Sequence, residues 1–182
     1  MTARDDGGGR MSSAARGSLL SILIPSLMMV ACASGDRPSS RAPSVAPLEP
    51  HAMRLRPSQD PLVELERWAK LHHVAAGCIV TAVGSLTRVS IRYANREEPT
   101  VLEGHFEVTS LVGTLSETGS HLHITVADGE GRSFGGHLLE GSAIYTTLEV
   151  VVGQLPGVGF DREVDPTYGY RELVVRPRPG GL

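Results

Sequence analysis

Cysteine is almost absent from this sequence: the 182 residues include only Cys32 and Cys78. Cys78 lies in the apolar stretch GCIVTAV, where no activating partner is suggested nearby. We therefore predict a small buried side chain there rather than a nucleophile. If Cys32 is modified, as considered below, no internal disulfide can form, and the domain must fold on its hydrophobic core alone.

Aromatic residues make up only 4% of the chain, and there is no excess of positive charge. Residues 33–182 carry 14 Lys plus Arg against 18 Asp plus Glu, a net charge of −4 with histidine neutral. No cluster of Lys or Arg interleaved with aromatic residues appears. This balance gives no general attraction to nucleic acid.

No hydrophobic run is long enough to cross a bilayer. The run from Leu19 to Cys32 has 14 residues and no charge, whereas a spanning helix needs roughly 20 residues. With Arg10 and Arg16 before it, residues 1–32 are typical of a signal peptide.

The end of this run, MVAC, resembles the lipobox of bacterial lipoproteins, although Met29 stands where leucine is usual. The resemblance implies acylation of Cys32 and a lipid anchor in the cell envelope. A plain secretory signal is one alternative. The other is an artefactual extension of a cytoplasmic protein whose translation starts near Met53.

Residues 33–52 contain four prolines and many small residues, a composition that predicts an extended linker. A folded domain over residues 53–176 and a C-terminal tail over 177–182 complete the expected organisation.

The domain begins with an amphipathic pattern that predicts one helix over residues 60–73, with Asp60 as its cap and Pro61 in its first turn. His72 and His73 then end the helix, where imidazolium favours the helix dipole, and we exclude them from any site.

Seven strand-like runs follow: CIVTAVG, TRVSIRYA, EGHFEVTSLVGTLS, HLHITVAD, RSFGGHLLEG, AIYTTLEVVVGQL and YRELVVRP. They predict an α+β domain with a mostly antiparallel sheet of about seven strands and one main N-terminal helix. One helix cannot cover both faces of such a sheet, so either the sheet closes on itself or other subunits cover it.

Four motifs occur in order: GSLTRVSIRYA (84–94), GHFEVTSLVGTLS (104–116), SHLHITVADGEGRSFGGHLLEGS (120–142) and TTLEVVV (146–152). Together they resemble the plants and prokaryotes conserved (PPC) domain, in its bacterial branch, over about 120 residues. The resemblance implies a central antiparallel sheet and a homotrimer. In plants the domain follows an AT-hook in DNA-binding nuclear proteins. This chain lacks the AT-hook, and RPRPGG (176–181) is only weakly similar to it.

Three of the seven histidines lie in SHLHITVADGEGRSFGGHL, residues 120–138. His121 and His123 point to one face of a strand, and the apolar residues between them to the other. Only an odd-numbered loop, such as residues 129–131, keeps the apolar residues of both strands on one face. Paired residue numbers then sum to 260, so His123 faces His137 and His121 lies diagonally.

Three converging neutral imidazoles are a ligand set for zinc, and three protein ligands leave a fourth position open, as in reactive zinc sites. The resemblance implies a zinc-like divalent ion as well, because bacterial members share the H-x-H and G-G-H pattern and the plant branch lacks it. From spacing alone, a solvated strand face explains H-x-H equally well.

Glu149 and Glu107 are the carboxylates that we consider for orienting a ligand histidine or for taking a proton from a metal-bound water. Their alternative is simple pairing with an arginine such as Arg92. His105 precedes Phe106 on a strand, and we expect it at the surface.

The main functional prediction is an envelope-anchored, trimeric binding module with a three-histidine metal site and an unknown small ligand. The alternative is a cytoplasmic DNA-associated PPC protein translated from near Met53. A zinc-dependent, hydrolase-like enzyme ranks third because the sequence offers no substrate-pocket signature.

Overall fold

The structure is a computed structural model that describes residues 47–178. The predicted signal peptide, Cys32 with its proposed lipid, and residues 179–182 lie outside this range. The elements are β1 (Glu49–Leu55), α1 (Pro61–Leu71), β2 (Gly77–Arg92), β3 (Thr100–Ser116), β4 (Gly119–Ala127), β5 (Ser133–Leu138), β6 (Ala143–Gln154), β7 (Val158–Val164) and β8 (Arg171–Pro177).

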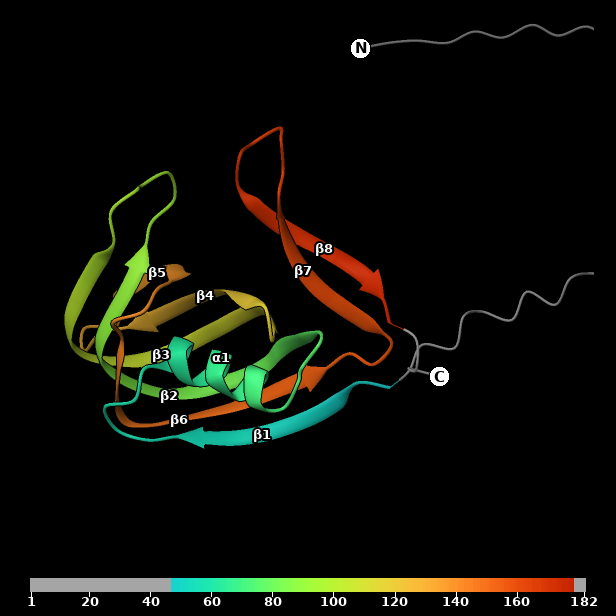
Figure 1. Ribbon diagram of the computed structural model, residues 1–182. Helices are drawn as coiled ribbons and strands as arrows, with labels where there is room; N and C mark the ends of the chain where they lie inside the picture. Colours follow the sequence, from blue (N-terminus) through green and yellow to red (C-terminus); the bar gives the residue numbers. More distant parts are fainter. Residues whose placement is uncertain (1–46, 179–182) are drawn as a thin grey trace, which may run out of the picture. The chain divides into compact units, whose positions relative to one another are not determined.

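Six strands form one antiparallel sheet in the order β1-β6-β2-β3-β4-β5, and β7 pairs with β8 in a separate hairpin. This confirms the mostly antiparallel β architecture with one short helix (Figure 1). The predicted sheet of about seven strands is wrong in one respect, because the run YRELVVRP forms β8 and pairs with β7 outside the six-stranded sheet. The sheet also curls until β5 pairs with the end of β2, where Ile91 faces Leu138 and Arg92 faces His137. Closure of the sheet on itself, one of the two expected solutions, therefore occurs at this end.

The core lies inside the curl and beneath α1. Leu65 and Ala69 of α1 are fully buried, and the helix packs against β3, β4 and β6. The strands contribute alternate residues, such as Leu122, Ile124 and Leu138. Because the residues between them point outward, the histidine face of β4 and β5 lies on the side opposite the core.

The start of α1 confirms the predicted cap. The Asp60 carboxylate accepts hydrogen bonds from the backbone N–H groups of Leu62 and Val63. The helix ends at Leu71, two residues before the predicted end, because His73 adopts a left-handed φ of 52°.

Two strand predictions need correction. CIVTAVG and TRVSIRYA form one continuous strand, β2, and Gly84 lies within it rather than ending it. A Cβ at Gly84 would lie 2.1 Å from the carbonyl oxygen of Thr147. The glycine therefore marks a close approach of β6, not a turn.

The other correction concerns β1 and β7, which the sequence pattern missed. β1 begins at Glu49, inside the segment predicted as a linker, and pairs with β6 along its whole length. It is an edge strand, where Pro50 is tolerated because its missing N–H costs no ladder bond on the open side.

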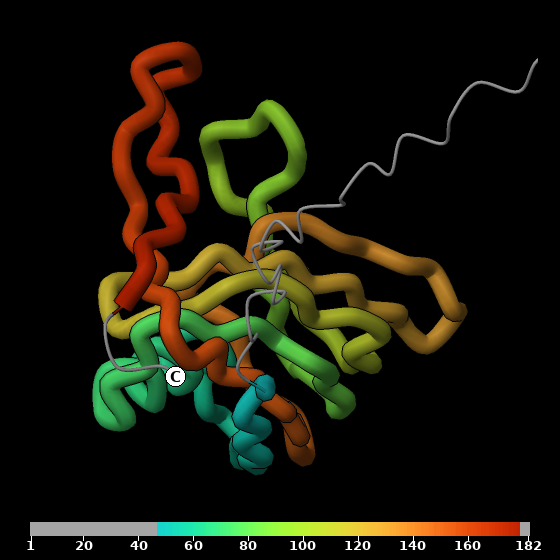
Figure 2. Tube along the Cα trace, turned by 90° about the vertical axis from the view of Figure 1, so that its right-hand side faces the viewer, coloured from blue at the N-terminus to red at the C-terminus, as the bar shows by residue number. Residues whose placement is uncertain are grey.

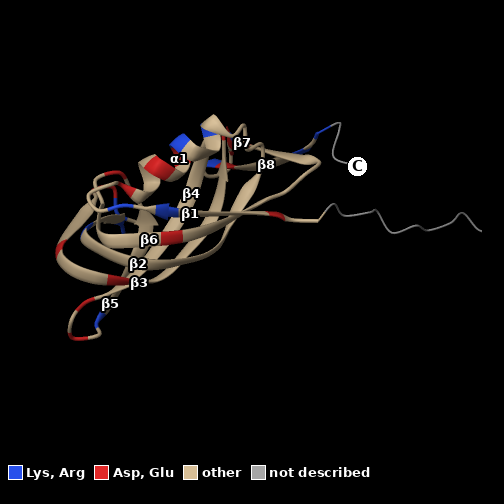
Figure 3. Cartoon of the chain, turned by 90° about the horizontal axis from the view of Figure 1, so that it is seen from below, with Lys and Arg blue, Asp and Glu red and all other residues tan. Residues whose placement is uncertain are grey.

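Two segments project from the same side of the sheet: the β7–β8 hairpin and the loop of residues 93–99 between β2 and β3 (Figure 2). Acidic and basic positions are interspersed along the strands, without a continuous basic face in the view of Figure 3. None of the helices in residues 47–178 is both long and apolar enough to span a membrane.

Candidate metal centre

The histidine hairpin has the predicted register. His123 faces His137, Thr125 faces Gly135 and Ala127 faces Ser133, so every pair sums to 260. The turn closes around Gly129–Gly131, where Gly131 has a φ of 78° and donates its N–H to the Asp128 carbonyl. Gly135 leaves the sheet face beside Thr125 open, as expected. A Cβ at this position would fill that space, since it would lie 2.8 Å from the Thr125 hydroxyl oxygen.

The three imidazoles converge on the outer face of β4 and β5. One ring nitrogen from each of His121, His123 and His137 lies within 4.8 Å of the other two. The Nε2 atoms of His121 and His123 are 3.1 Å apart. Two nitrogens bound tetrahedrally to zinc at 2.0–2.1 Å would be separated by roughly 3.3 Å, so these two rings already have nearly the spacing of zinc ligands.

One ring atom of the cluster gives a further indication. Nδ1 of His137 is buried and has no hydrogen-bond partner within the described residues. A buried polar atom without a partner costs free energy, which a bound ion or an ordered water would recover. With only nitrogen donors, this ligand set fits a zinc-like divalent ion.

The surroundings keep two of the rings neutral, which is the form that binds metal. Burial lowers the pKa of His137 to about 4, and the nearby His121 and Arg92 act in the same direction. Burial and the Arg162 guanidinium lower the pKa of His121 below its usual value.

Arginines surround the cluster. Arg92 lies across from His137 in the β2–β5 pairing. The Nη1 atom of Arg162, on β7, lies 3.4 Å from Nδ1 of His121. The Nη2 atom of the same guanidinium donates a hydrogen bond to the Thr114 hydroxyl oxygen at 3.0 Å. A wide hollow is lined by residues of the 93–99 loop, of β4 and β5, and of the β7–β8 hairpin. Figure 2 shows the backbone of the loop and of the hairpin projecting from the same side of the sheet. The charged and histidine residues that line the hollow are Arg92, Arg96, Arg162, Arg171, Glu97, Glu98, Glu172, His121 and His137.

The two predicted carboxylates do not join the centre. Glu107 faces Ala127, about 14 Å along β4 from His123 at ~3.4 Å per residue. Glu149 faces Arg54 of β1 and Val83 of β2, on a strand separated from β4 by β2 and β3. Neither carboxylate forms an ion pair with Arg92.

The other histidines also stay apart, as predicted. His72 stacks on Trp68, with Nδ1 2.9 Å from the Trp68 carbonyl oxygen. His73 lies 3.6 Å from the Glu117 carboxylate. His105 is exposed and packs edge-on against Tyr145. Cys78 differs from the prediction: it is half-buried, because it alternates with core residues on β2.

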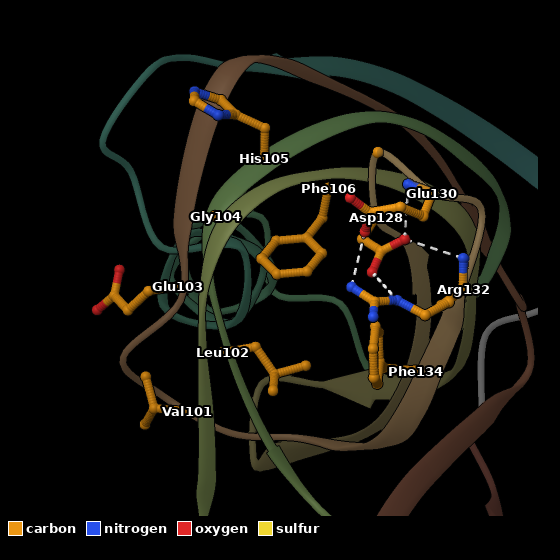
Figure 4. A pocket seen from close by; sticks show the side chains of 11 residues that line it. Val101, Leu102, Glu103, Gly104, His105, Phe106, Asp128, Glu130, Arg132 and Phe134 are labelled. Atoms are coloured by element: carbon orange, nitrogen blue, oxygen red, sulfur yellow. Dashed lines mark hydrogen bonds and ion pairs between the residues drawn. The ribbon is translucent and has the colours of Figure 1, made fainter.

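A second hollow lies at the other end of the histidine hairpin, around Phe106 and Phe134, whose rings pack edge-on (Figure 4). Its arginine, Arg132, forms ion pairs with Asp128 and Glu130, both at 2.7 Å. Its positive charge is therefore locally balanced, in contrast to the arginines around the histidines.

The arginines around the histidines were not predicted from the sequence. Arg92 was considered only as a possible partner of a glutamate, and Arg162 and Arg171 were not singled out. Their approach to the histidines depends on the curl of the sheet and on the pairing of β7 with β8. The sequence pattern predicted the strand β8, but it predicted neither β7 nor the curl.

Comparison with known proteins identifies related chains. The bifunctional protein GlmU of Synechococcus sp. (strain JA-2-3B'a(2-13)) is 41% identical over 147 residues, which are 78% of this chain and 23% of GlmU. The AT-hook motif nuclear-localized protein 13 of Arabidopsis thaliana is 32% identical over 117 residues, 57% of this chain and 26% of that protein. The chain thus spans only about a quarter of the length of these curated relatives.

Solved structures share the fold. A hypothetical protein from Salmonella cholerae-suis is 41% identical with a TM-score of 0.72, covering 73% of this chain and 96% of that one. The metal-containing protein AF0104 from Archaeoglobus fulgidus is 26% identical with a TM-score of 0.61, covering 71% and 98%. A candidate DNA-binding protein from Bacteroides thetaiotaomicron has the same fold at 20% identity, with a TM-score of 0.60 and coverage of 71% and 97%.

The family model of the Plants and Prokaryotes Conserved (PCC) domain, also abbreviated PPC, matches residues 42–156. This match includes β1 to β6 and all three histidines of the cluster. The chain therefore belongs to the Plants and Prokaryotes Conserved domain family.

Proposed function

We propose that this PPC domain binds a divalent metal ion, most simply zinc, through His121, His123 and His137. The convergence of three ring nitrogens within 4.8 Å carries the proposal. The unpartnered Nδ1 of His137 and the metal-containing relative from Archaeoglobus support it. Zinc held by three histidines would supply a Lewis-acidic fourth position.

The test is zinc binding by the full chain. We expect one equivalent of zinc per chain by elemental analysis of protein that was never exposed to a chelator. Protein that has been chelated and dialysed should then take up one equivalent in a calorimetric titration. His123→Ala should abolish this binding, because only two of the three histidines would remain to hold the ion. His72→Ala is the matched control, since His72 lies against Trp68 and away from the centre. Less than a tenth of an equivalent in the wild-type chain would refute the proposal.

We also propose DNA association as a second candidate function. The name of the Bacteroides neighbour, a candidate DNA-binding protein, favours it. In this chain, the supporting feature is the group of four arginines around the hollow, none of which has an ion-pair partner among residues 47–178. The net negative charge of the chain opposes it.

Fluorescence anisotropy with a labelled duplex tests DNA association. If the four arginines each contact a phosphate, the logarithm of the binding constant should fall with the logarithm of salt concentration with a slope of roughly −3.6. Arg96→Ala with Arg171→Ala should halve that slope. Failure to bind at 50 mM salt would eliminate this function.

A homotrimer is our proposal for assembly. Exposed valines on the outer sheet face support it, because Val80, Val83, Val101 and Val112 are each more than half exposed and such apolar surface favours a protein contact. Light scattering after size exclusion should give three times the chain mass. A monomer mass at all concentrations would contradict the proposal.

For location, we propose a lipid anchor on Cys32 in the cell envelope. A cytoplasmic protein starting near Met53 remains the competing proposal, but it would lose Glu49–Ala52 from the β1 pairing with β6. Palmitate labelling with cell fractionation separates the two, since only the anchored form is labelled and sediments with membranes. We do not extend the proposal to hydrolysis because Glu107 and Glu149 lie away from the histidines.

A further inference from the structure

We propose that the centre is a metal-coupled oxyanion site. A small molecule with a carboxylate or phosphate group would bind at the open position of the metal, and Arg162 and Arg92 would hold its oxygens. This inference rests on the proposed metal binding and names the class of ligand that the centre takes.

The first argument concerns charge pairing. Five of the arginines in residues 47–178 form ion pairs with carboxylates: Arg67, Arg88, Arg132, Arg176 and Arg178. The other six in this range form none: Arg54, Arg56 and the four that line the histidine hollow, the only place where such arginines gather around the histidines. Arginine guanidinium presents a donor fork that matches carboxylate and phosphate geometry, so unpaired arginines beside an open metal position favour an oxyanion.

Carboxylates also line this hollow and contribute to its net charge. Glu97, Glu98 and Glu172 oppose Arg92, Arg96, Arg162 and Arg171. The lining is thus positive by one charge without metal and by three with a divalent ion in place. Metal loading therefore changes a nearly balanced hollow into one that attracts anions.

The second argument concerns the proton on His121. An arginine can only donate, so the contact from Nη1 of Arg162 requires Nδ1 of His121 to act as acceptor. A metal bound at Nδ1 occupies the same lone pair. A metal bound at Nε2 requires the hydrogen to move to Nδ1, which then repels the guanidinium. In both cases metal binding releases this contact.

After this release, the guanidinium would remain near the centre. Arg162 is also held by its bond to Thr114, which faces His121 across β3 and β4. On the other side, Arg92 is fixed by the β2–β5 pairing next to His137. Within residues 47–178 its one side-chain hydrogen bond is long, 3.5 Å, and goes to the Arg96 carbonyl oxygen. Two guanidinium groups therefore flank the centre from opposite strands.

The experiment measures anion binding and metal binding on the same full-chain protein. Acetate and methyl phosphate are titrated by calorimetry into zinc-loaded chain freed of excess zinc, and into chelated chain. We expect binding to the zinc-loaded form at least ~10-fold tighter than to the chelated form. The two probes distinguish a carboxylate ligand from a phosphate ligand, and tighter binding of either one supports the inference.

Arg162→Gln gives the decisive signature. Loss of a charge-assisted bond worth about 1.5–3 kcal/mol should weaken anion binding ~10- to 100-fold. The same change should leave zinc affinity equal or raise it, since a competing contact and a nearby positive charge are removed. Arg132→Gln, in the hollow of Figure 4, is the matched control and should change neither affinity.

The outcomes separate the two proposals. If no zinc binds, the proposed function fails. If zinc binds but neither anion prefers the zinc-loaded form, or Arg162→Gln behaves like Arg132→Gln, only this inference fails. If a DNA duplex displaces both anions at equal phosphate concentration, the hollow is a DNA-binding site and the small-ligand inference is overturned.

Discussion

The pairing of β5 with the end of β2 can be tested at Gly136. A Cβ at this position would lie 2.7 Å from the carbonyl oxygen of Arg92, whereas ordinary contact begins near 3.4 Å. Because the obstacle is backbone, Gly136→Ala must push β5 away from β2 by about 0.7 Å, the difference between these distances. The pairing contains only Ile91 with Leu138 and Arg92 with His137.

Two effects follow from this displacement. Overpacking of this kind costs about 1–3 kcal/mol of the free energy of unfolding. It also moves His137 by more than the ~0.2 Å tolerance of metal–ligand distances. We expect zinc affinity to fall roughly 10- to 100-fold, the range seen when groups that orient a ligand are removed.

Urea unfolding of the metal-free chain and calorimetric zinc titration measure the two effects separately. Gly129→Ala is the control in the same hairpin, because nothing lies within 4 Å of a Cβ placed there. Both variants replace glycine by alanine, so both lower the conformational entropy of the unfolded chain by the same amount. If Gly136→Ala matches Gly129→Ala in both stability and zinc affinity, the pairing does not position the centre and our reasoning is wrong.

Three further predictions concern stability. Asp60→Ala should lower the free energy of unfolding by about 1–3 kcal/mol in urea, because the carboxylate caps α1 and also accepts from the Gly141 N–H at 2.7 Å; an effect below ~0.5 kcal/mol would contradict this role. Gly84→Val should prevent β6 from approaching β2, since its Cβ would lie 2.1 Å from the Thr147 carbonyl oxygen, and circular dichroism should show a melting temperature at least ~10 °C lower. In metal-free protein, His137 has a pKa of about 4 when folded and 6.5 as its reference value, so the unfolded chain takes up a proton first as pH falls. The free energy of unfolding should therefore decrease from pH 6.5 towards pH 4, more steeply than in His137→Gln, and equal slopes in urea titrations would refute the effect.

Local pattern determined several features from the sequence alone. The alternation of LHITV and FGGHL allowed only one parity for the hairpin loop, because a one-residue slip would expose the apolar side chains. That constraint fixed the pairing of His123 with His137. Asp60 before Pro61 likewise located the start of the helix, because aspartate is favoured at the cap and proline at the first helical position.

The tertiary structure alone decided what surrounds the histidines. Arg92 reaches His137 because the sheet curls until β2 and β5 meet. Arg162 reaches His121 because β7 and β8 form a hairpin beyond the sheet. Alternation reports which face of a strand is buried, but it carries no information about which distant strands meet. The sequence therefore determined which three histidines converge, and only long-range packing determined the charge around them.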